Sequence, residues 1–146
     1  MKRFEEFLES GKVKKQSPNK ARALSLTQES QKKEKFLEVS IKSVPADDMS
    51  PNFIVDYCYD ILMEMIRAKM LLDGFNAGNS HEAEVSYMEV LGFTSVETHF
   101  MDEIRYYRNG TKYYGTMLTK EYADKVYLFM KKINKTLNEK ITINSV

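Results

Sequence analysis

One short segment of the chain concentrates the side chains that could do chemistry. It reads Arg105-Tyr-Tyr-Arg108-Asn109-Gly-Thr-Lys112-Tyr113-Tyr114-Gly115. Arg105, Arg108 and Lys112 are three and four residues apart, so they form one ridge if the segment is helical. Cations on a ridge can bind phosphate, and tyrosines can stack on nucleobases. The segment therefore predicts a phosphate-binding edge with stacking groups beside it, from Tyr106, Tyr107, Tyr113 and Tyr114.

A purely structural interpretation of the same segment stays open. Cations near the last carbonyl groups of a helix are favourable, because the helix end carries partial negative charge. Tyrosines can fill the end of a helical bundle while their hydroxyl groups reach water.

Three acids upstream bear on this choice. Asp56, Asp60 and Glu64 follow steps of four residues, and like charges at that spacing repel by a few tenths of a kcal/mol (about 0.2–0.5) per pair. They could form a solvated face, salt bridges to Arg105 and Arg108, or a polar pocket that positions Arg108. An Arg108 neutralised by an acid would not be free for phosphate.

Other reactive residue types form no recognisable site. His81 and His99 lie on different segments without metal-ligand spacing, so we expect no metal site and no cofactor. Cys58, the only cysteine, falls in an apolar run and is expected to act as a small buried hydrophobe. Gly74-Phe-Asn-Ala-Gly78 follows an expected helix and so lacks the context of a phosphate-binding glycine loop.

Helical periodicity recurs along the chain and strand signals are nearly absent. We predict an all-α fold, an antiparallel up-down four-helix bundle with an additional short N-terminal helix. Residues 1–16 would form the N-terminal helical extension, 17–141 the bundle and 142–146 a frayed tail. The expected helix starts are Ser17-Pro18, Ser50-Pro51, Asn79 with Glu82 in a capping box, and Thr119. The helix from Ser95 is expected to turn Val96, Phe100, Ile104 and Tyr107 inward.

Composition and charge limit the class of protein. The chain has 146 residues, 42% hydrophobic and 29% charged, which is typical of one globular domain. Residues 1–43 carry 11 Lys/Arg against 6 Asp/Glu, residues 44–104 carry 2 against 12, and residues 105–146 carry 9 against 3. The acidic middle could pack between the basic ends, or a separate basic face could meet phosphate. Acids near the N-terminus and the lack of a long apolar run predict a cytoplasmic protein with no membrane contact.

Three features together resemble the HEPN family of small helical-bundle domains. They are the apolar helix from Asn52 to Gly74, the loop Asn79-Ser80-His81-Glu82-Ala83, and Arg108-Asn109 near the end of the next helix. Catalytic members have an arginine, often followed by a polar residue, and a histidine about five positions later. Here Arg108 and Asn109 fill the first two places, while Tyr113, or Tyr114 in a longer spacing, stands at the histidine position.

The resemblance implies a homodimer in which two motif segments face a shared cleft. Catalytic members are metal-independent ribonucleases, with Arg108, Asn109 and Tyr113 as the matching positions. Tyrosine, with a reference pKa of about 10, is a poor general base near neutral pH. We therefore expect an RNA- or nucleotide-binding module, non-catalytic or weakly catalytic, whose ligand-binding residues are Arg105, Arg108, Lys112 and Tyr114.

Two alternatives are kept. One is a toxin-type endoribonuclease of a toxin–antitoxin pair, in which tyrosine does part of the work of histidine. The other is a partner-binding subunit for a small nucleotidyltransferase. An Arg108 open to solvent in a cleft would favour RNA chemistry, whereas a motif buried against a helix of its own chain would favour the partner-binding subunit.

Overall fold

The computed structural model describes residues 1–144, with side chains to residue 142, and this part of the chain is mostly helical. The all-α class is confirmed. The elements in chain order are α1 Phe4–Glu9, β1 Lys14–Lys15, α2 Lys20–Ser43, a single 3₁₀ turn Ala46–Asp48, α3 Pro51–Leu72, β2 Phe75–Asn76, α4 His81–Val90, α5 Ser95–Tyr113 and α6 Lys120–Asn144. Residues 142–144 of the expected frayed tail belong to α6, and the last two lie outside the described residues.

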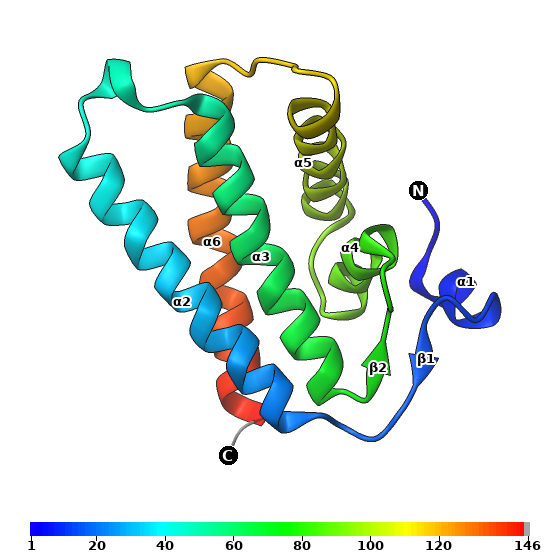
Figure 1. Cartoon of the computed structure of the whole chain (residues 1–146). Coiled ribbons are helices and arrows are strands. Elements are labelled where there is room, and N and C mark those ends of the chain that lie inside the picture. The colour runs from blue at the N-terminus through cyan, green and yellow to red at the C-terminus, as the bar shows by residue number, and fades with distance from the viewer. Residues whose placement is uncertain (145–146) are drawn as a thin grey trace.

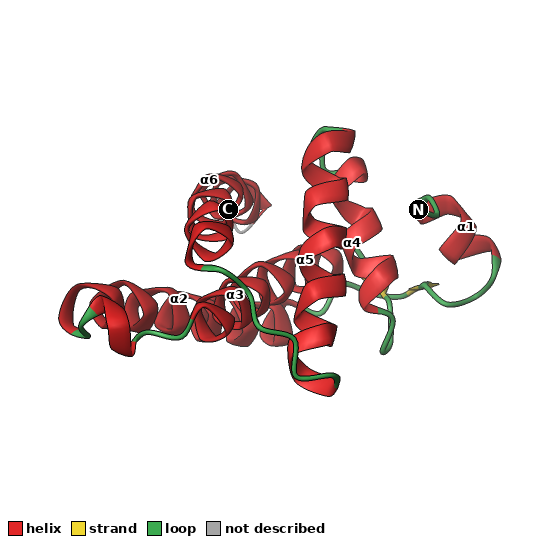
Figure 2. Cartoon of the chain, turned by 90° about the horizontal axis from the view of Figure 1, so that it is seen from above, coloured by secondary structure: helices red, strands yellow, loops and turns green. Residues whose placement is uncertain are grey.

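Helix α3 is the centre of the fold, because its side chains are apolar around most of its circumference. It packs against α2 and α6 on one side and against α4 and α5 on the other (Figure 1). Its fully buried residues include Val55, Cys58, Ile61, Leu62 and Ile66. Seen from above, α5 is steeply inclined to α2 and α3 (Figure 2). The C-terminal end of α5 therefore projects beside the first turns of α3.

Two of the four expected helix starts are confirmed and two shift. The Ser50 hydroxyl accepts from the N–H of Phe53 at 3.4 Å with Pro51 in the first turn, and Thr119 caps α6 through the N–H of Tyr122. Helix α2 begins at Lys20 and is capped by Asn19 rather than by Ser17, and Ser80 rather than Asn79 caps α4.

The shift in α2 has a clear cause in the N-terminal segment. Strands β1 and β2 form a two-residue antiparallel ladder that the sequence did not indicate. The N–H of Gln16 continues it by donating to the carbonyl of Gly74 at 2.8 Å, which keeps the chain extended beyond Lys15. Gly74 has φ +84°, and a Cβ there would lie 2.7 Å from the carbonyl oxygen of Gln16.

Residues 1–16 are thereby packed onto the rest of the molecule. Phe4 and Phe7 of α1 are buried, and the ring of Phe4 lies 5.2 Å from that of Phe75 and 4.8 Å from that of Tyr87. The N-terminal extension thus shares the hydrophobic core with α4. None of the helices between residues 1 and 144 is both long and apolar enough to cross a membrane.

Candidate functional site

The motif segment forms the C-terminal half of α5, from Arg105 to Tyr113, and the turn that follows it. Helix α5 begins with a capping box, in which Thr94 and Glu97 each accept a backbone N–H of the other. It ends where the carbonyl of Gly110 accepts the N–H groups of Tyr114 and Thr116, at 2.9 and 3.2 Å. Gly115, with φ +69°, allows this reversal because glycine adopts positive φ without a steric cost. The chain therefore folds back over the end of α5.

One face of α5 carries the cations of the motif, and two of them, Arg108 and Lys112, are turned toward α3. Arg108 donates from Nε to Asp56 at 2.9 Å, and its other nitrogen lies 3.7 Å from an oxygen of Asp60. Its guanidinium also lies over the ring of Tyr59, 5.3 Å from the centroid. Lys112 pairs with the second oxygen of Asp56 at 3.3 Å. The salt bridge between Arg108 and the acids of α3 that the sequence allowed is therefore formed.

Arg105 takes different partners from those expected. It pairs with Asp102 of its own helix at 2.8 Å and with Glu82 of α4 at 3.4 Å. The three predicted phosphate ligands thus lie on one ridge, and each has an acidic partner within its own chain.

Burial strengthens the pairing of Arg108. Its side chain is 17% exposed and that of Asp56 is 23% exposed. Burial alone would lower the pKa of Arg108, but the hydrogen bond and the charge of Asp56, with that of Asp60, raise it above its ordinary value. Burial raises the pKa of the Asp60 carboxyl, and the negative charge of Asp56 raises it further. Arg108 is therefore a permanent cation held between two carboxylates.

The acidic ridge of α3 continues this network beyond the motif. Glu64 pairs with Lys33 of α2, and burial raises the pKa of the Glu64 carboxyl. One turn further, Arg67 makes two hydrogen bonds, of 2.5 and 2.9 Å, to Glu84 of α4, whose side chain is almost fully buried. Sequence reasoning missed Glu84. It could have been found from Arg67, which continues the helical spacing of Asp60 and Glu64 and, as a cation on a helix that is largely buried, needs an acidic partner.

The tyrosines of the motif lie on the other side of α5. At about 100° per residue, Tyr113 is turned roughly 140° from Arg108, and Tyr106 roughly 160°. Tyr113 is 74% exposed and Tyr114 is 84% exposed. The cations and the tyrosines of the motif therefore do not form one surface. The angle between the cations and the tyrosines follows from their spacing in the sequence, so the two surfaces could have been predicted.

The exposed tyrosines line a pocket of about 510 Å³. Tyr106, Tyr107, Tyr113 and Tyr114 provide its aromatic side chains. Asn109, Gly110 and Thr116 complete its lining. The ring of Tyr107 also packs edge-on against that of Tyr122 of α6, with centroids 5.4 Å apart. The pocket thus lies at the end of α5, where the chain turns toward α6.

A single side chain of α3 holds the turn that closes this pocket. The amide of Asn52 donates to the carbonyl of Thr116 and accepts the N–H of Leu118, both at 2.8 Å. Asn52 therefore clamps the backbone on both sides of Met117. It is a second residue that sequence reasoning did not assign to the site, since an asparagine in the first turn of a helix is usually a solvated polar group.

The remaining reactive groups form no catalytic set. Among the described residues, no three His, Cys, Asp or Glu side chains are placed to hold a metal ion. His81 Nδ1 lies 3.2 Å from the hydroxyl of Tyr59, and His99 Nδ1 lies 2.7 Å from the carbonyl of Ser95 in its own helix. Burial raises the pKa of the Cys58 thiol to about 12, so the thiol is inert near neutral pH.

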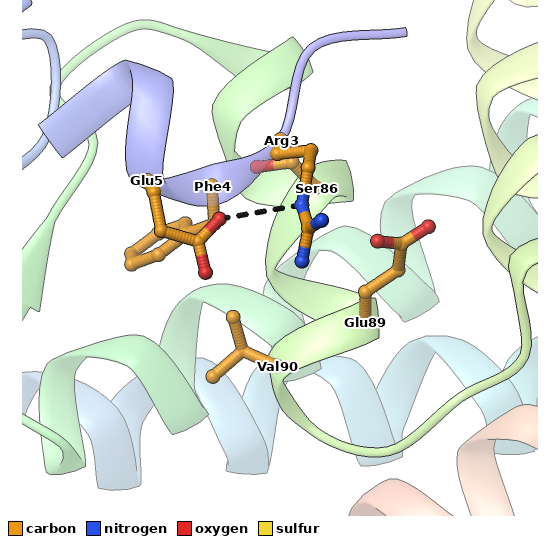
Figure 3. A pocket seen from close by; sticks show the side chains of 6 residues that line it. All are labelled: Arg3, Phe4, Glu5, Ser86, Glu89 and Val90. Carbon is orange, nitrogen blue, oxygen red and sulfur yellow. Dashed lines mark ion pairs between the residues drawn. The ribbon is translucent and has the colours of Figure 1, made fainter. Parts of the chain in front are cut away.

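A second pocket lies between the N-terminal segment and α4 (Figure 3). It has a volume of only about 90 Å³, and Arg3 lies within it, 3.6 Å from the carboxylate of Glu5. Ligand pockets for drug-sized molecules are typically about 300–1,000 Å³. This pocket is therefore too small to compete with the tyrosine-lined pocket as a ligand site.

Comparison with known proteins gives no match that bears on this site. No family model matches the chain, and neither the curated proteins nor the solved structures include a match to it. The chemistry of the site is therefore argued from its own residues.

Proposed function

We propose that the chain is a HEPN-like four-helix bundle that binds RNA or a nucleotide without cleaving it. The nucleobase would be held in the tyrosine-lined pocket, and the arginine ridge would serve the fold. The observation that carries this proposal is a pocket of about 510 Å³ with four tyrosines in its lining. Aromatic side chains stack on any nucleobase, and one such contact contributes about 1–3 kcal/mol.

The arrangement of Arg108 supports binding without cleavage. Metal-independent cleavage needs a group that moves a proton and a cation that stabilises charge, both at one phosphate. Arg108 is held by Asp56 and Asp60, and Tyr113 lies on the opposite side of α5. A toxin-type endoribonuclease would need a second copy of the chain to bring the missing group to Arg108. The homodimer that the resemblance implies is therefore the setting in which cleavage should be sought.

A partner-binding subunit is the second candidate. The position of Arg108 against α3 of its own chain is the arrangement expected for such a subunit, and a separate observation also favours it. Tyr106, Tyr113, Tyr114 and Met117 are large, strongly exposed side chains around one turn. Tyrosine and methionine are enriched in protein–protein interfaces. With its cations already neutralised, the motif fits a protein partner, such as a small nucleotidyltransferase, without an RNA.

RNA binding and RNA cleavage measured side by side test these candidates. A labelled single-stranded RNA is titrated in EDTA with wild type, Tyr113→Leu, Arg108→Ala and the control Phe36→Leu. Phe36 is an exposed aromatic residue of α2. Helix α2 lies on the far side of α3 from α5 (Figure 1). Circular dichroism reports whether each variant is folded.

We expect binding without cleavage, weakened about tenfold in Tyr113→Leu, which corresponds to about 1.4 kcal/mol. Phe36→Leu, and folded Arg108→Ala, should bind as wild type. Cleavage that disappears in Arg108→Ala would replace the proposal with the endoribonuclease. RNA binding that is absent from wild type would leave the partner-binding subunit.

A further inference from the structure

No charged side chain among the residues that the structure describes lines the tyrosine-lined pocket. Its lining consists of the four tyrosines with Asn109, Gly110 and Thr116. The cations nearest in sequence, Arg108 and Lys112, are turned to the acids of α3. A phosphate inside this pocket would therefore meet no counter-charge.

The backbone around the pocket also disfavours an anion. The pocket lies at the C-terminal end of α5, where unpaired carbonyl groups give a helix partial negative charge. Gly110 is one of the residues that line the pocket, and its carbonyl accepts the N–H groups of Tyr114 and Thr116. Those N–H groups are thus already used within the chain. The polarity of the site fits an uncharged ligand.

Asn109 supplies the polar group that could orient such a ligand. None of the hydrogen bonds found among residues 1–144 engages its side-chain amide. A free amide offers a donor and an acceptor side by side. This pair is complementary to the N6 and N7 positions of adenine, which present a donor and an acceptor in the same way.

We infer that the pocket recognises an uncharged purine base, adenine, between its tyrosines and the Asn109 amide. The phosphate of a nucleotide or of RNA stays outside in solvent and adds little to the affinity. This inference rests on the proposed function and specifies how its ligand is held. A site of this kind binds a nucleoside as well as a nucleotide, and its affinity changes little with salt.

Equilibrium dialysis with three probes tests the inference. Adenosine carries the base without phosphate, ribose 5-phosphate carries the phosphate without base, and AMP carries both. Each is measured at 50 and 200 mM NaCl with wild type, Tyr113→Leu, Asn109→Leu and Phe36→Leu, all checked by circular dichroism. Guanosine and uridine measure the preference for the base.

Adenosine and AMP should bind within about threefold of each other at both salt concentrations, and ribose 5-phosphate should not bind. Tyr113→Leu should weaken adenosine binding about tenfold. Asn109→Leu should remove the preference for adenosine over guanosine and uridine. Phe36→Leu should match wild type.

Two results would overturn the inference and spare the proposed function. One is AMP or RNA binding that depends on phosphate and falls steeply with salt. The other is adenosine binding whose preference over guanosine and uridine is left unchanged by Asn109→Leu. If neither RNA nor any of the probes binds wild type, both the inference and the proposed function fail.

Discussion

The salt bridge between Arg108 and Asp56 decides whether the motif arginine serves the fold or a ligand, and its strength can be measured. Arg108→Met keeps most of the aliphatic stem and removes the charge, and Asp56→Asn keeps the shape of its side chain. The double-mutant cycle of these two changes isolates their interaction from their separate effects.

The exposure of the two side chains sets the expected magnitude. Breaking a fully buried ion pair costs about 3–5 kcal/mol, whereas a fully exposed pair contributes about 0–1 kcal/mol. Arg108 and Asp56 are 17% and 23% exposed, so we expect a coupling free energy of about 2 kcal/mol. If Arg108→Met alone lowers the free energy of unfolding by about the same 2 kcal/mol, the melting temperature should fall by about 6 °C, because a domain of this size loses roughly 3 °C per kcal/mol.

Urea unfolding followed by circular dichroism gives the free energies of unfolding of wild type, the two single variants and the double variant. The matched control is the pair Lys132–Glu97, in which Lys132 is 73% exposed, and its coupling should be below about 0.5 kcal/mol. A coupling between Arg108 and Asp56 no larger than that of the control would refute the reasoning. Arg108 would then be free for phosphate, and the case against catalysis would lose its main support.

Three further changes test other parts of the structure. Asn52→Ala removes both hydrogen bonds to the turn before α6. Limited proteolysis should cut that turn faster than in wild type, while the free energy of unfolding falls by only about 1–2 kcal/mol. An unchanged rate of proteolysis would show that Asn52 does not hold the turn. Burial raises the pKa of Asp60, so ionisation of this carboxyl destabilises the folded state. Wild type should therefore lose stability relative to Asp60→Asn as the pH rises through the range in which carboxyl groups ionise. Urea unfolding at pH 3 and pH 7 measures this, and a free energy of unfolding that rises for wild type relative to Asp60→Asn would contradict it. Gly74→Ala forces positive φ on a residue with a Cβ and places that atom against the carbonyl of Gln16. We expect the free energy of unfolding to fall by about 3 kcal/mol. A melting temperature equal to that of wild type would show that the N-terminal segment is not held there.

The fold class was predictable because long apolar stripes at helical spacing dominate the sequence. The step of four from Ile54 to Cys58 and the steps that continue it belong to the most buried helix. Single positions were less reliable, as Val96 shows, because it was expected to face inward and is 77% exposed. A stripe fixes the average direction of a helix face, but residues in the first turn can lie beyond the neighbouring helix.

The site was predictable in composition but not in arrangement. Except for Thr116, the residues that line the pocket belong to the motif, as do Arg108 and Lys112, which pair with α3. The turn beside the pocket, however, is held by Asn52, 64 residues earlier in the sequence. Such a contact depends on how α3 and α5 cross, which local spacing does not encode. The ladder between residues 14–15 and 75–76 was missed for the same reason, since two-residue strands leave no periodic pattern.

The closure of the N-terminal segment on α4 has a consequence for how the chain is made. Residues 1–16 are synthesised before residues 75–87, but Phe4 finds its partners only at Phe75 and Tyr87. Closing a loop of that length must precede the contacts that stabilise it, so this step is slow relative to helix formation. The apolar face of α1 therefore stays uncovered until Phe75 and Tyr87 have also been synthesised. A truncation that removes residues 1–16 would leave Phe75 of β2 and Tyr87 of α4 without their aromatic neighbour Phe4.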